Sequence, residues 1–231
     1  MKYWRITEDD LILEEKNLIQ GGNLMNTFSN ADLKALILPL FLEQLLEVLV
    51  GVADTFMVSY AGEAAVSGVS LVNMFNTVFI FLFSALAAGG AVVVSQYIGS
   101  RSRERGSLAA GQLVMVAMVF SVGAMVFSLV LNRSLLRLLF GEVEPDVMEA
   151  CVTYLKISAY SYPAIAVYNA GAAIYRSMAK TRTTMYISLL ANGINIAGNA
   201  VGVFLFHAGV AGVAYPSLIA RSFAAVVIIV L

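Results

Sequence analysis

The chain has 231 residues, of which 60% are hydrophobic and 13% are charged, and its formal net charge at pH 7 is −1. Soluble domains are about half apolar and about a quarter charged, so this composition indicates an integral membrane protein. The nearly balanced charge gives no sign of a nucleic-acid partner, and the one cysteine, Cys151, excludes a disulfide within the chain.

Residues 1–33 precede the first long apolar run. Their opening stretch, MKYWRITEDDLILEEKN, is too charged to be a cleavable signal peptide. We therefore interpret residues 1–33 as a polar tail on the cytoplasmic side of the membrane.

The rest of the chain is divided by its charged residues into long uncharged or nearly uncharged runs. A helix needs roughly 20 apolar residues to cross the hydrocarbon core, and these runs are too long for the strands of a transmembrane β-barrel. The sequence therefore predicts an all-α, polytopic membrane protein, a bundle of six transmembrane helices over residues 34–231. The predicted spans lie near 35–60, 65–99, 107–131, 150–178, 184–206 and 210–231.

Basic residues cluster in two of the predicted connections, RSRERG at 101–106 and YRSMAKTRTT at 175–184. The connections AGEAA and HAGVAG, on the opposite side, contain no Lys or Arg. Because cytoplasmic loops carry an excess of Lys and Arg, we expect both termini on the cytoplasmic side of a cell membrane.

The first predicted span contains three carboxylates, Glu43, Glu47 and Asp54. At about 100° per residue, the three lie within about 40° of one another on the helix surface. A charged stripe facing lipid is costly, so this stripe is expected to face other helices or a water-filled cavity. Two interpretations stay open: groups that hold helices together by hydrogen bonds, or a proton or cation site.

Three polar residues of the last two spans lie at the membrane depth of Asp54. At about 1.5 Å per residue, Asp54 lies about 30 Å along its helix from the inside, and Asn195, Asn199 and Ser217 reach the same outer half of the membrane. Carboxylate, amide and hydroxyl oxygens suit a hard cation such as Na⁺, held by Asp54, Asn195 and Asn199. A carboxylate equally suits a proton, and amides and hydroxyls also form ordinary hydrogen bonds between helices.

Further polar residues inside the spans are weaker candidates for a substrate or proton pathway. Aromatic and amide groups that line a cavity can hold an organic cation, although such groups often only pack. The candidates besides Glu43 and Glu47 are Asn73, Asn76, Tyr162 and Asn169. Arg221, inside the sixth span, either extends to the membrane surface or pairs with an acid.

Several stretches, in order along residues 33–231, resemble the multidrug and toxic compound extrusion (MATE) transporters. LPLFLEQLLEVLVGVADTFMVSYAGEAAVSGVSL is similar to the first helix and following loop of that family, and GGAVVVSQYIGSRSRERG to the end of the second helix. YRSMAKTRTTMYISLLANGINIAGN resembles the connection from the fourth to the fifth helix, and GVAGVAYPSLIAR the start of the sixth.

The resemblance implies secondary active export of drugs or other organic cations against an inward flow of Na⁺ or H⁺. In the family pattern Asp54 matches the acid of the first helix, Pro39 its bending proline and Asn195 the asparagine of the fifth helix. Asn199 stands where many members have aspartate, and Ser217 where some have threonine. These differences leave proton coupling through Asp54 as an expectation and weaken the case for tight Na⁺ binding.

The family has twelve helices in two lobes, and this chain corresponds to the N-terminal lobe. We expect a fragment, a truncated reading frame, or a half-transporter that pairs with a second subunit. The alternatives to export are a flippase for lipid-linked oligosaccharides, which wide basic cavities would favour, and a membrane module that transports nothing. No catalytic constellation or cofactor motif is evident, so an enzyme is not expected.

Overall fold

The computed structural model describes residues 30–231 of the chain, with side chains from Leu33 onward. The predicted cytoplasmic tail lies outside the described residues, except that residues 30–33 already belong to the first helix, α2. Every regular element in this part of the chain is helical, which confirms the predicted fold class. The elements are α2 (Asn30–Ser59), α3 (Glu63–Gly99), α4 (Arg103–Val130), α5 (Asn132–Phe140), α6 (Pro145–Tyr160), α7 (Tyr162–Ser177), α8 (Thr181–Ala200), the π-helix η1 (Val201–Leu205) and α9 (Ala211–Val230).

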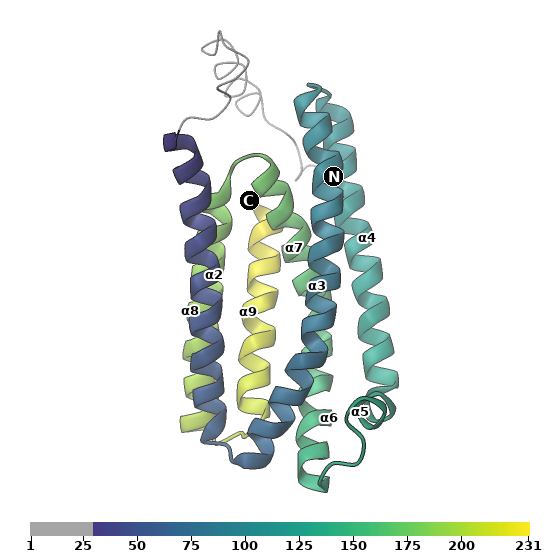
Figure 1. Cartoon of the computed structure of the whole chain (residues 1–231), viewed down its shortest axis with the longest axis vertical. Helices are drawn as coiled ribbons and strands as arrows, with labels where there is room; N and C mark the ends of the chain where they lie inside the picture. Colours follow the sequence, from purple (N-terminus) through teal and green to yellow (C-terminus); the bar gives the residue numbers. More distant parts are fainter. Residues whose placement is uncertain (1–29) are drawn as a thin grey trace.

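Five stretches of the described residues are long and apolar enough to cross a membrane. They are Leu33–Ser59, Glu63–Gly99, Arg103–Val130, Thr181–Leu205 and Ala211–Val230. The remaining predicted span, 150–178, is built from two consecutive helices, α6 and α7, which Figure 1 shows running along the bundle between α4 and α9.

The fourth crossing of the membrane, formed by α6 and α7 together, is interrupted at Ser161. Pro163 lies in the first turn of α7, and a proline has no backbone N–H with which to continue the helical hydrogen-bond ladder. The backbone N–H of Ser161 bonds the carbonyl of Ser158 at 2.9 Å, which tightens the last turn of α6. Ser161 is fully buried at this interruption, and its hydroxyl oxygen accepts a hydrogen bond from Nη1 of Arg221, on α9, at 2.8 Å.

The stretch before the fourth crossing differs from the prediction. The predicted spans near 107–131 and 150–178 leave residues 132–149 as a connection, whereas residues 132–140 form the short helix α5 and the crossing itself begins at Pro145. Proline is favoured at the first position of a helix, because its missing N–H needs no partner there. Leu136 anchors α5 and is 1% exposed.

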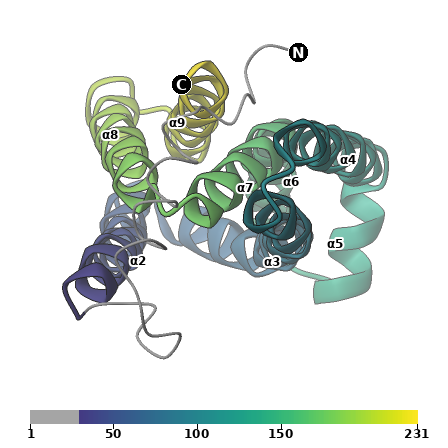
Figure 2. The ribbon, with the colours of Figure 1, turned by 90° about the horizontal axis from the view of Figure 1, so that it is seen from above.

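The helices form two groups that meet at α7 and α9. In one group α3 packs against α4, α6 and α7, and in the other α2 and α9 both pack on α8. Seen from above, α2, α8, α9, α7 and α3 follow one another around the molecule (Figure 2). The outward faces of the helices expose large apolar side chains such as Val52, Phe81 and Val119, as expected for surfaces in contact with lipid.

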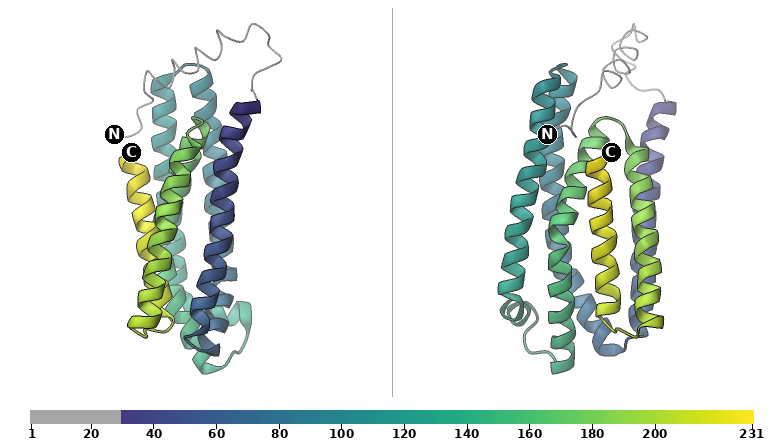
Figure 3. Two further views of the ribbon diagram at one scale, coloured as in Figure 1. Left: turned by 90° about the vertical axis from the view of Figure 1, so that its left-hand side faces the viewer. Right: turned by 180° about the vertical axis from the view of Figure 1, so that it is seen from behind.

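The connections at the two ends of the bundle differ in charge. The α3–α4 and α7–α8 connections, with their arginines and lysine, lie at the end where α2 starts and α9 finishes (Figures 1 and 3). At the opposite end, the α8–α9 connection brings two glycines together. A Cβ atom added to Gly202 would meet the carbonyl oxygen of Gly212, so the backbones of η1 and α9 touch there.

Candidate functional site

A cavity of about 530 Å³ lies among five helices, α2, α3, α7, α8 and α9. Its size is that of a pocket for a drug-sized molecule. The polar and charged groups that line it are Glu47, Asp54, Asn73, Thr77, Tyr168, Asn169, Ser188, Asn192, Asn195, Ser217 and Arg221. Each of the five helices contributes at least one of these side chains, so the cavity is the polar interior of an otherwise apolar bundle.

A chain of hydrogen bonds runs from Asp54 along the wall of this cavity. The Nδ2 atom of Asn199 donates to Oδ1 of Asp54 at 2.6 Å and also to Oδ1 of Asn195 at 3.1 Å. The Nδ2 atom of Asn195 in turn donates to Oγ of Ser217 at 2.8 Å. The structure therefore brings together the four residues predicted as a coupling site, although their role in coupling stays a prediction.

The residues of this hydrogen-bond chain lie where helix geometry requires. Asn195 and Asn199 are four residues apart on α8 and share one face, since a helix completes about one turn in that distance. Asn195, Asn199 and Ser217 are buried, while Asp54 is partly accessible and lines the cavity. Asp54 is thus the most exposed of the four residues, and its carboxylate is accessible to an ion or a water molecule in the cavity.

Asp54 also borders a second, smaller cavity of about 80 Å³. The two cavities share Gly51, Asp54 and Asn73, and the smaller one continues toward Val58 and Val66, at the end of the bundle with the α2–α3 connection. The carboxylate of Asp54 therefore lies between the central cavity and the smaller cavity, which is nearer to the end of the bundle opposite the basic connections.

The donor atoms around Asp54 suit a small cation only in part. Oxygen ligands are what a hard cation requires, and in this arrangement Asn199 presents a nitrogen to the carboxylate. The Oδ1 atom of Asn199 is buried and has no hydrogen-bond partner in the part of the chain described. Reversing this amide would turn Oδ1 toward Asp54 and supply one more of the several oxygen ligands that Na⁺ needs.

The predicted pathway residues divide into two sets. Glu47, Asn73 and Asn169 line the central cavity. Asn76 and Tyr162 lie outside the cavity lining. Both residues are buried where α3 packs on α7, and there the hydroxyl of Tyr162 donates to Oδ1 of Asn76 at 2.7 Å.

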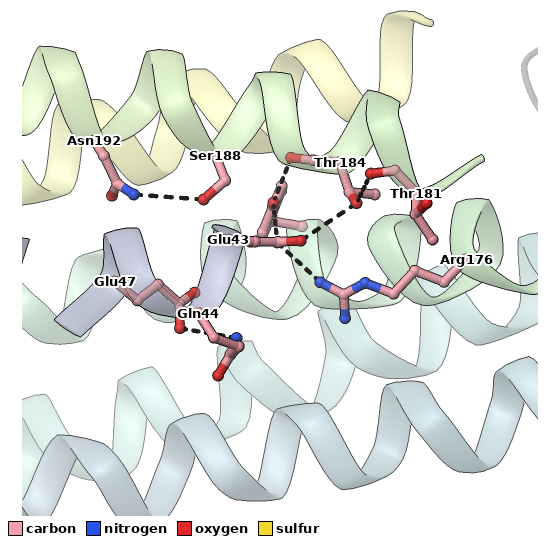
Figure 4. A network of polar contacts seen from close by, with 9 residues as sticks. Glu43, Gln44, Glu47, Arg176, Thr181, Thr184, Ser188 and Asn192 are labelled. Atoms are coloured by element: carbon pink, nitrogen blue, oxygen red, sulfur yellow. Dashed lines mark hydrogen bonds and ion pairs between the residues drawn. The ribbon is translucent and has the colours of Figure 1, made fainter. Parts of the chain in front are cut away.

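Glu43 also lies outside the cavity lining, although it shares a face of α2 with Glu47 and Asp54. Its carboxylate is 2% exposed and accepts hydrogen bonds from Nη2 of Arg176 at 2.9 Å, the hydroxyl of Tyr168 at 3.3 Å and Oγ1 of Thr184 at 3.4 Å. Figure 4 shows Arg176, from α7, and Thr184, from α8, converging on Glu43. The predicted acidic stripe therefore faces the bundle, but its first member is held in an ion pair.

Pro39 lies one turn before Glu43, and α2 continues through it as a single helix. The proline side chain is buried, and its missing N–H leaves the carbonyl one turn earlier without its helical partner. The bending assigned to Pro39 by resemblance stays a prediction.

A model of the MatE family matches residues 39–201, more than two thirds of the chain. The chain belongs to the MatE family. The members of this family are transporters, and this MatE chain is a multi-pass membrane protein. The resemblance found in the sequence is thereby confirmed.

Relatives of this MatE chain include proteins named for multidrug resistance. It is 31% identical to the uncharacterized transporter YisQ of Bacillus subtilis over 84% of its own length and 43% of YisQ. It is 28% identical to a probable multidrug resistance protein NorM of Thermotoga maritima, over 82% of its own length and 41% of NorM. The chain thus spans less than half of the length of the curated relatives it matches.

Solved transporter structures of the same family have the same fold. A MATE crystal structure in the bent conformation matches with a TM-score of 0.78 at 22% identity, over 85% of this chain and 44% of the solved chain. An outward-facing multidrug resistance MATE transporter matches with a TM-score of 0.79 at 22% identity, over 84% of this chain and 44% of the other.

The MatE chain also has polar cavity residues beyond the candidates predicted from the sequence. Among them are Thr77, Ser188 and Asn192. The position of Asn192, three residues before Asn195 on α8, was the signal that could have found it. Arg221 was predicted to extend to the membrane surface or to pair with an acid. The structure instead places it on the cavity wall, where it forms no ion pair with a described acid.

Proposed function

We propose that this chain forms one lobe of a cation-coupled exporter of drugs or organic cations, with Asp54 as the coupling group. The observation that carries the proposal is the hydrogen-bond chain Asp54–Asn199–Asn195–Ser217 on the wall of a cavity of about 530 Å³. It links α2, α8 and α9, so a change at Asp54 acts on three helices together.

In this mechanism Asp54 binds H⁺ or Na⁺ from the outer side through the smaller cavity. Binding of the cation neutralises the carboxylate and weakens its hydrogen bond to Asn199, which loosens α2 from α8. The ion drives export only if it binds the inward-facing and outward-facing states with different affinity. Pro39 is the position at which α2 bends between the two states.

The arrangement of donors favours H⁺ over Na⁺ as the coupling ion. Among the four residues of the hydrogen-bond chain only Asp54 carries a charge, and an N–H group faces it. A proton on Asp54 needs no further ligand, whereas Na⁺ needs several oxygen atoms.

A cationic substrate is supported by the charges that line the cavity. Two carboxylates, Glu47 and Asp54, line it together with the single cation Arg221. An excess of negative charge attracts organic cations and disfavours the diphosphate of a lipid-linked oligosaccharide.

The functional unit in this proposal contains a second six-helix lobe, supplied by further sequence or by another subunit. The chain covers 44% of the matched outward-facing transporter chain, so the other lobe of that fold has no counterpart in these residues. We further propose that the lobe spans the cell membrane with its basic connections and both termini in the cytoplasm, following the positive-inside rule.

The test is efflux from proteoliposomes driven by a pH or Na⁺ gradient. The chain is reconstituted alone and together with a C-terminal lobe, and the substitutions Asp54→Asn and Glu142→Gln are compared. We expect gradient-driven efflux of a cationic dye to require the second lobe, to be lost with Asp54→Asn and to survive Glu142→Gln, because Glu142 is exposed and lies outside the spans. Full efflux by Asp54→Asn would exclude Asp54 as the coupling group.

The same experiment separates the export proposal from a module that transports nothing. If both preparations are correctly folded and neither the chain alone nor the two-lobe assembly exports the dye, the result would favour the non-transporting module.

A further inference from the structure

Lys156 is a charged side chain on the outer surface of the fourth crossing. It is exposed on α6 and lines neither of the two cavities described above. Six residues before it, Ala150 touches α3, since a Cβ atom added to Gly68 would lie 2.7 Å from the Cβ atom of Ala150. Five residues after it, Ser161 accepts the hydrogen bond from Arg221 of α9. Both contacts involve stretches that are long and apolar enough to cross a membrane, so Lys156 lies at the level of the bilayer.

The ammonium group of Lys156 has no acid beside it in the described structure. No carboxylate between residues 33 and 231 forms an ion pair with it, and the ion pair that those residues contain joins Arg176 to Glu43. A lysine within a membrane crossing is costly in lipid, so it usually faces a cavity or pairs with another group. Lys156 faces no described cavity and therefore requires an anion that residues 33–231 do not supply.

Lys156 belongs to a polar stripe that runs along α6. Glu149, Thr153, Lys156 and Tyr160 follow one another at intervals of four, three and four residues, which places them within about 60° on the helix surface. Glu149, Lys156 and Tyr160 are exposed and Thr153 is half-buried, whereas Cys151 on the opposite face is 1% exposed. A polar stripe that faces away from the bundle indicates a polar ligand at this surface.

The side chains of the stripe extend toward the nearer membrane surface. Side chains of an α-helix tilt toward its N-terminus, and α6 begins at Pro145, at the end of the bundle opposite the basic connections (Figure 1). Lys156 therefore lays its carbon stem along the helix and carries its ammonium group toward the lipid headgroups on that side. Tyr160 lies one turn deeper and directs its hydroxyl the same way, toward Lys156.

The charges along α6 match those of one class of lipid headgroup. A lysine ammonium binds phosphate as a point charge, and a tyrosine hydroxyl adds a hydrogen-bond donor. Nearer the membrane surface Asp146 and Glu149 are exposed acids, and Glu149 lies about 10.5 Å from Lys156 along the helix axis. A phosphate beside Lys156, with an ammonium group farther out beside Glu149, is the order of charges in an ethanolamine phospholipid. A glycerol headgroup has no such outer cation.

We propose that Glu149, Lys156 and Tyr160 form a binding site for an ethanolamine phospholipid in the leaflet on the side away from the basic connections. Lys156 and Tyr160 hold the phosphate, and Glu149 holds the ammonium group. The bound lipid compensates the charge of Lys156 within the bilayer and fastens α6 to it. The site is separate from the central cavity, so it depends neither on the coupling ion nor on the direction of transport.

The test measures lipid binding to the purified, delipidated chain in detergent by native mass spectrometry. Phosphatidylethanolamine and phosphatidylglycerol with identical acyl chains are titrated separately, and inorganic phosphate is added as a soluble competitor. The variants are Lys156→Met, Lys156→Arg and Glu149→Gln. The matched control is Arg133→Gln, which removes an exposed cation of α5 at the same end of the bundle. The unfolding midpoint of each variant is measured alongside.

We expect phosphatidylethanolamine to bind several-fold more tightly than phosphatidylglycerol, and inorganic phosphate not to displace it. Lys156→Met should weaken its binding about tenfold, the change expected for the loss of a hydrogen bond to a charged group. Lys156→Arg should retain the binding, because it keeps the charge. Glu149→Gln should remove the preference for ethanolamine. The unfolding midpoints should stay unchanged, because these exposed side chains contribute little to packing, and Arg133→Gln should change nothing.

Four results would overturn the proposal. Unchanged affinity of Lys156→Met would exclude Lys156 as the phosphate ligand, and equal weakening by Arg133→Gln would mean that total charge governs binding. Displacement by inorganic phosphate would indicate a site for anions in general. Loss of a dimer with Lys156→Met, at unchanged lipid affinity, would assign Lys156 to a contact between two copies of the chain.

Discussion

The guanidinium of Arg176 donates a 2.9 Å hydrogen bond to the buried carboxylate of Glu43, which lies 133 residues earlier in the chain. Arg176 lies in the last turn of α7, where a cation also interacts favourably with the helix dipole. Thr184, at the start of α8, donates to the other carboxylate oxygen at 3.4 Å. The contact therefore fastens the first crossing to the fourth and fifth at the end with the basic connections (Figure 4).

Arg176→Gln is expected to lower the free energy of unfolding by about 2–3 kcal/mol. Removing one partner of a fully buried pair costs about 3–5 kcal/mol, and the loss is smaller here because Arg176 is 39% exposed and partly screened by solvent. Thermal unfolding can be followed with a thiol-reactive dye, since Cys151 is a free, buried cysteine that becomes reactive only on unfolding.

The matched control for this prediction is Arg182→Gln, an exposed basic residue close to the same connection, which should change the unfolding midpoint little. The double variant Glu43→Gln with Arg176→Gln should be less destabilised than the sum of the two single variants. Simple additivity would mean that the pair does not contribute to stability.

Asn199→Asp is expected to create a Na⁺ site. A second carboxylate beside Asp54 repels the first unless a cation lies between them, and added ligand charge raises the affinity for hard cations. Binding of radioactive Na⁺ to the purified variant should be about tenfold tighter than to the unmodified chain. Asn192→Asp adds the same charge to the cavity away from Asp54 and should not do so; equal tightening by both variants would argue against a local site.

Gly202→Ala is expected to destabilise the chain by about 1–3 kcal/mol, the usual cost of overpacking. The added methyl group would meet the carbonyl oxygen of Gly212, and a backbone atom cannot move aside as the end of a flexible side chain can. Gly193→Ala is the control, because nothing lies within 4 Å of a Cβ atom there and alanine is the better helix former. A lower unfolding midpoint for Gly202→Ala alone is the expected result.

Tyr162→Phe is expected to lower the free energy of unfolding by about 1–2 kcal/mol without changing efflux of the cationic dye. The substitution removes the 2.7 Å hydrogen bond to Asn76 and leaves a buried amide oxygen without its donor. Neither residue lines the cavity, so efflux of the cationic dye by the two-lobe assembly should stay the same. Tyr160→Phe, at a position that is 57% exposed, is the control for stability. Slower efflux of the cationic dye by Tyr162→Phe would indicate that this tyrosine belongs to the substrate pathway after all.

The sequence predicted the membrane crossings and the direction in which the α2 acids face, because these follow from composition and periodicity. A run of apolar residues and a 100° step per residue were enough to place Asp54, Asn195, Asn199 and Ser217 at one depth. The hydrogen bonds between them in the structure obey the same two rules.

The sequence did not predict which acids would be held by a partner, because pairing depends on contacts between distant segments. Glu43 and Asp54 are on one face of α2, yet Arg176 is within reach of only the first. Arg221 likewise donates to the hydroxyl of Ser161, which lies 60 residues earlier in the chain and belongs to another crossing. Helical spacing within one segment contains no information on either contact.

The division of the fourth crossing into α6 and α7 also bears on how the protein enters the bilayer during synthesis. Each piece has 16 residues, about 24 Å of helix, which is short of a hydrocarbon core of about 30 Å. Neither piece can therefore leave the translocon as a stable crossing by itself. Both pieces pack along α3, which is synthesised earlier. We therefore expect α3 to provide the surface against which the fourth crossing is stabilised as it enters the membrane.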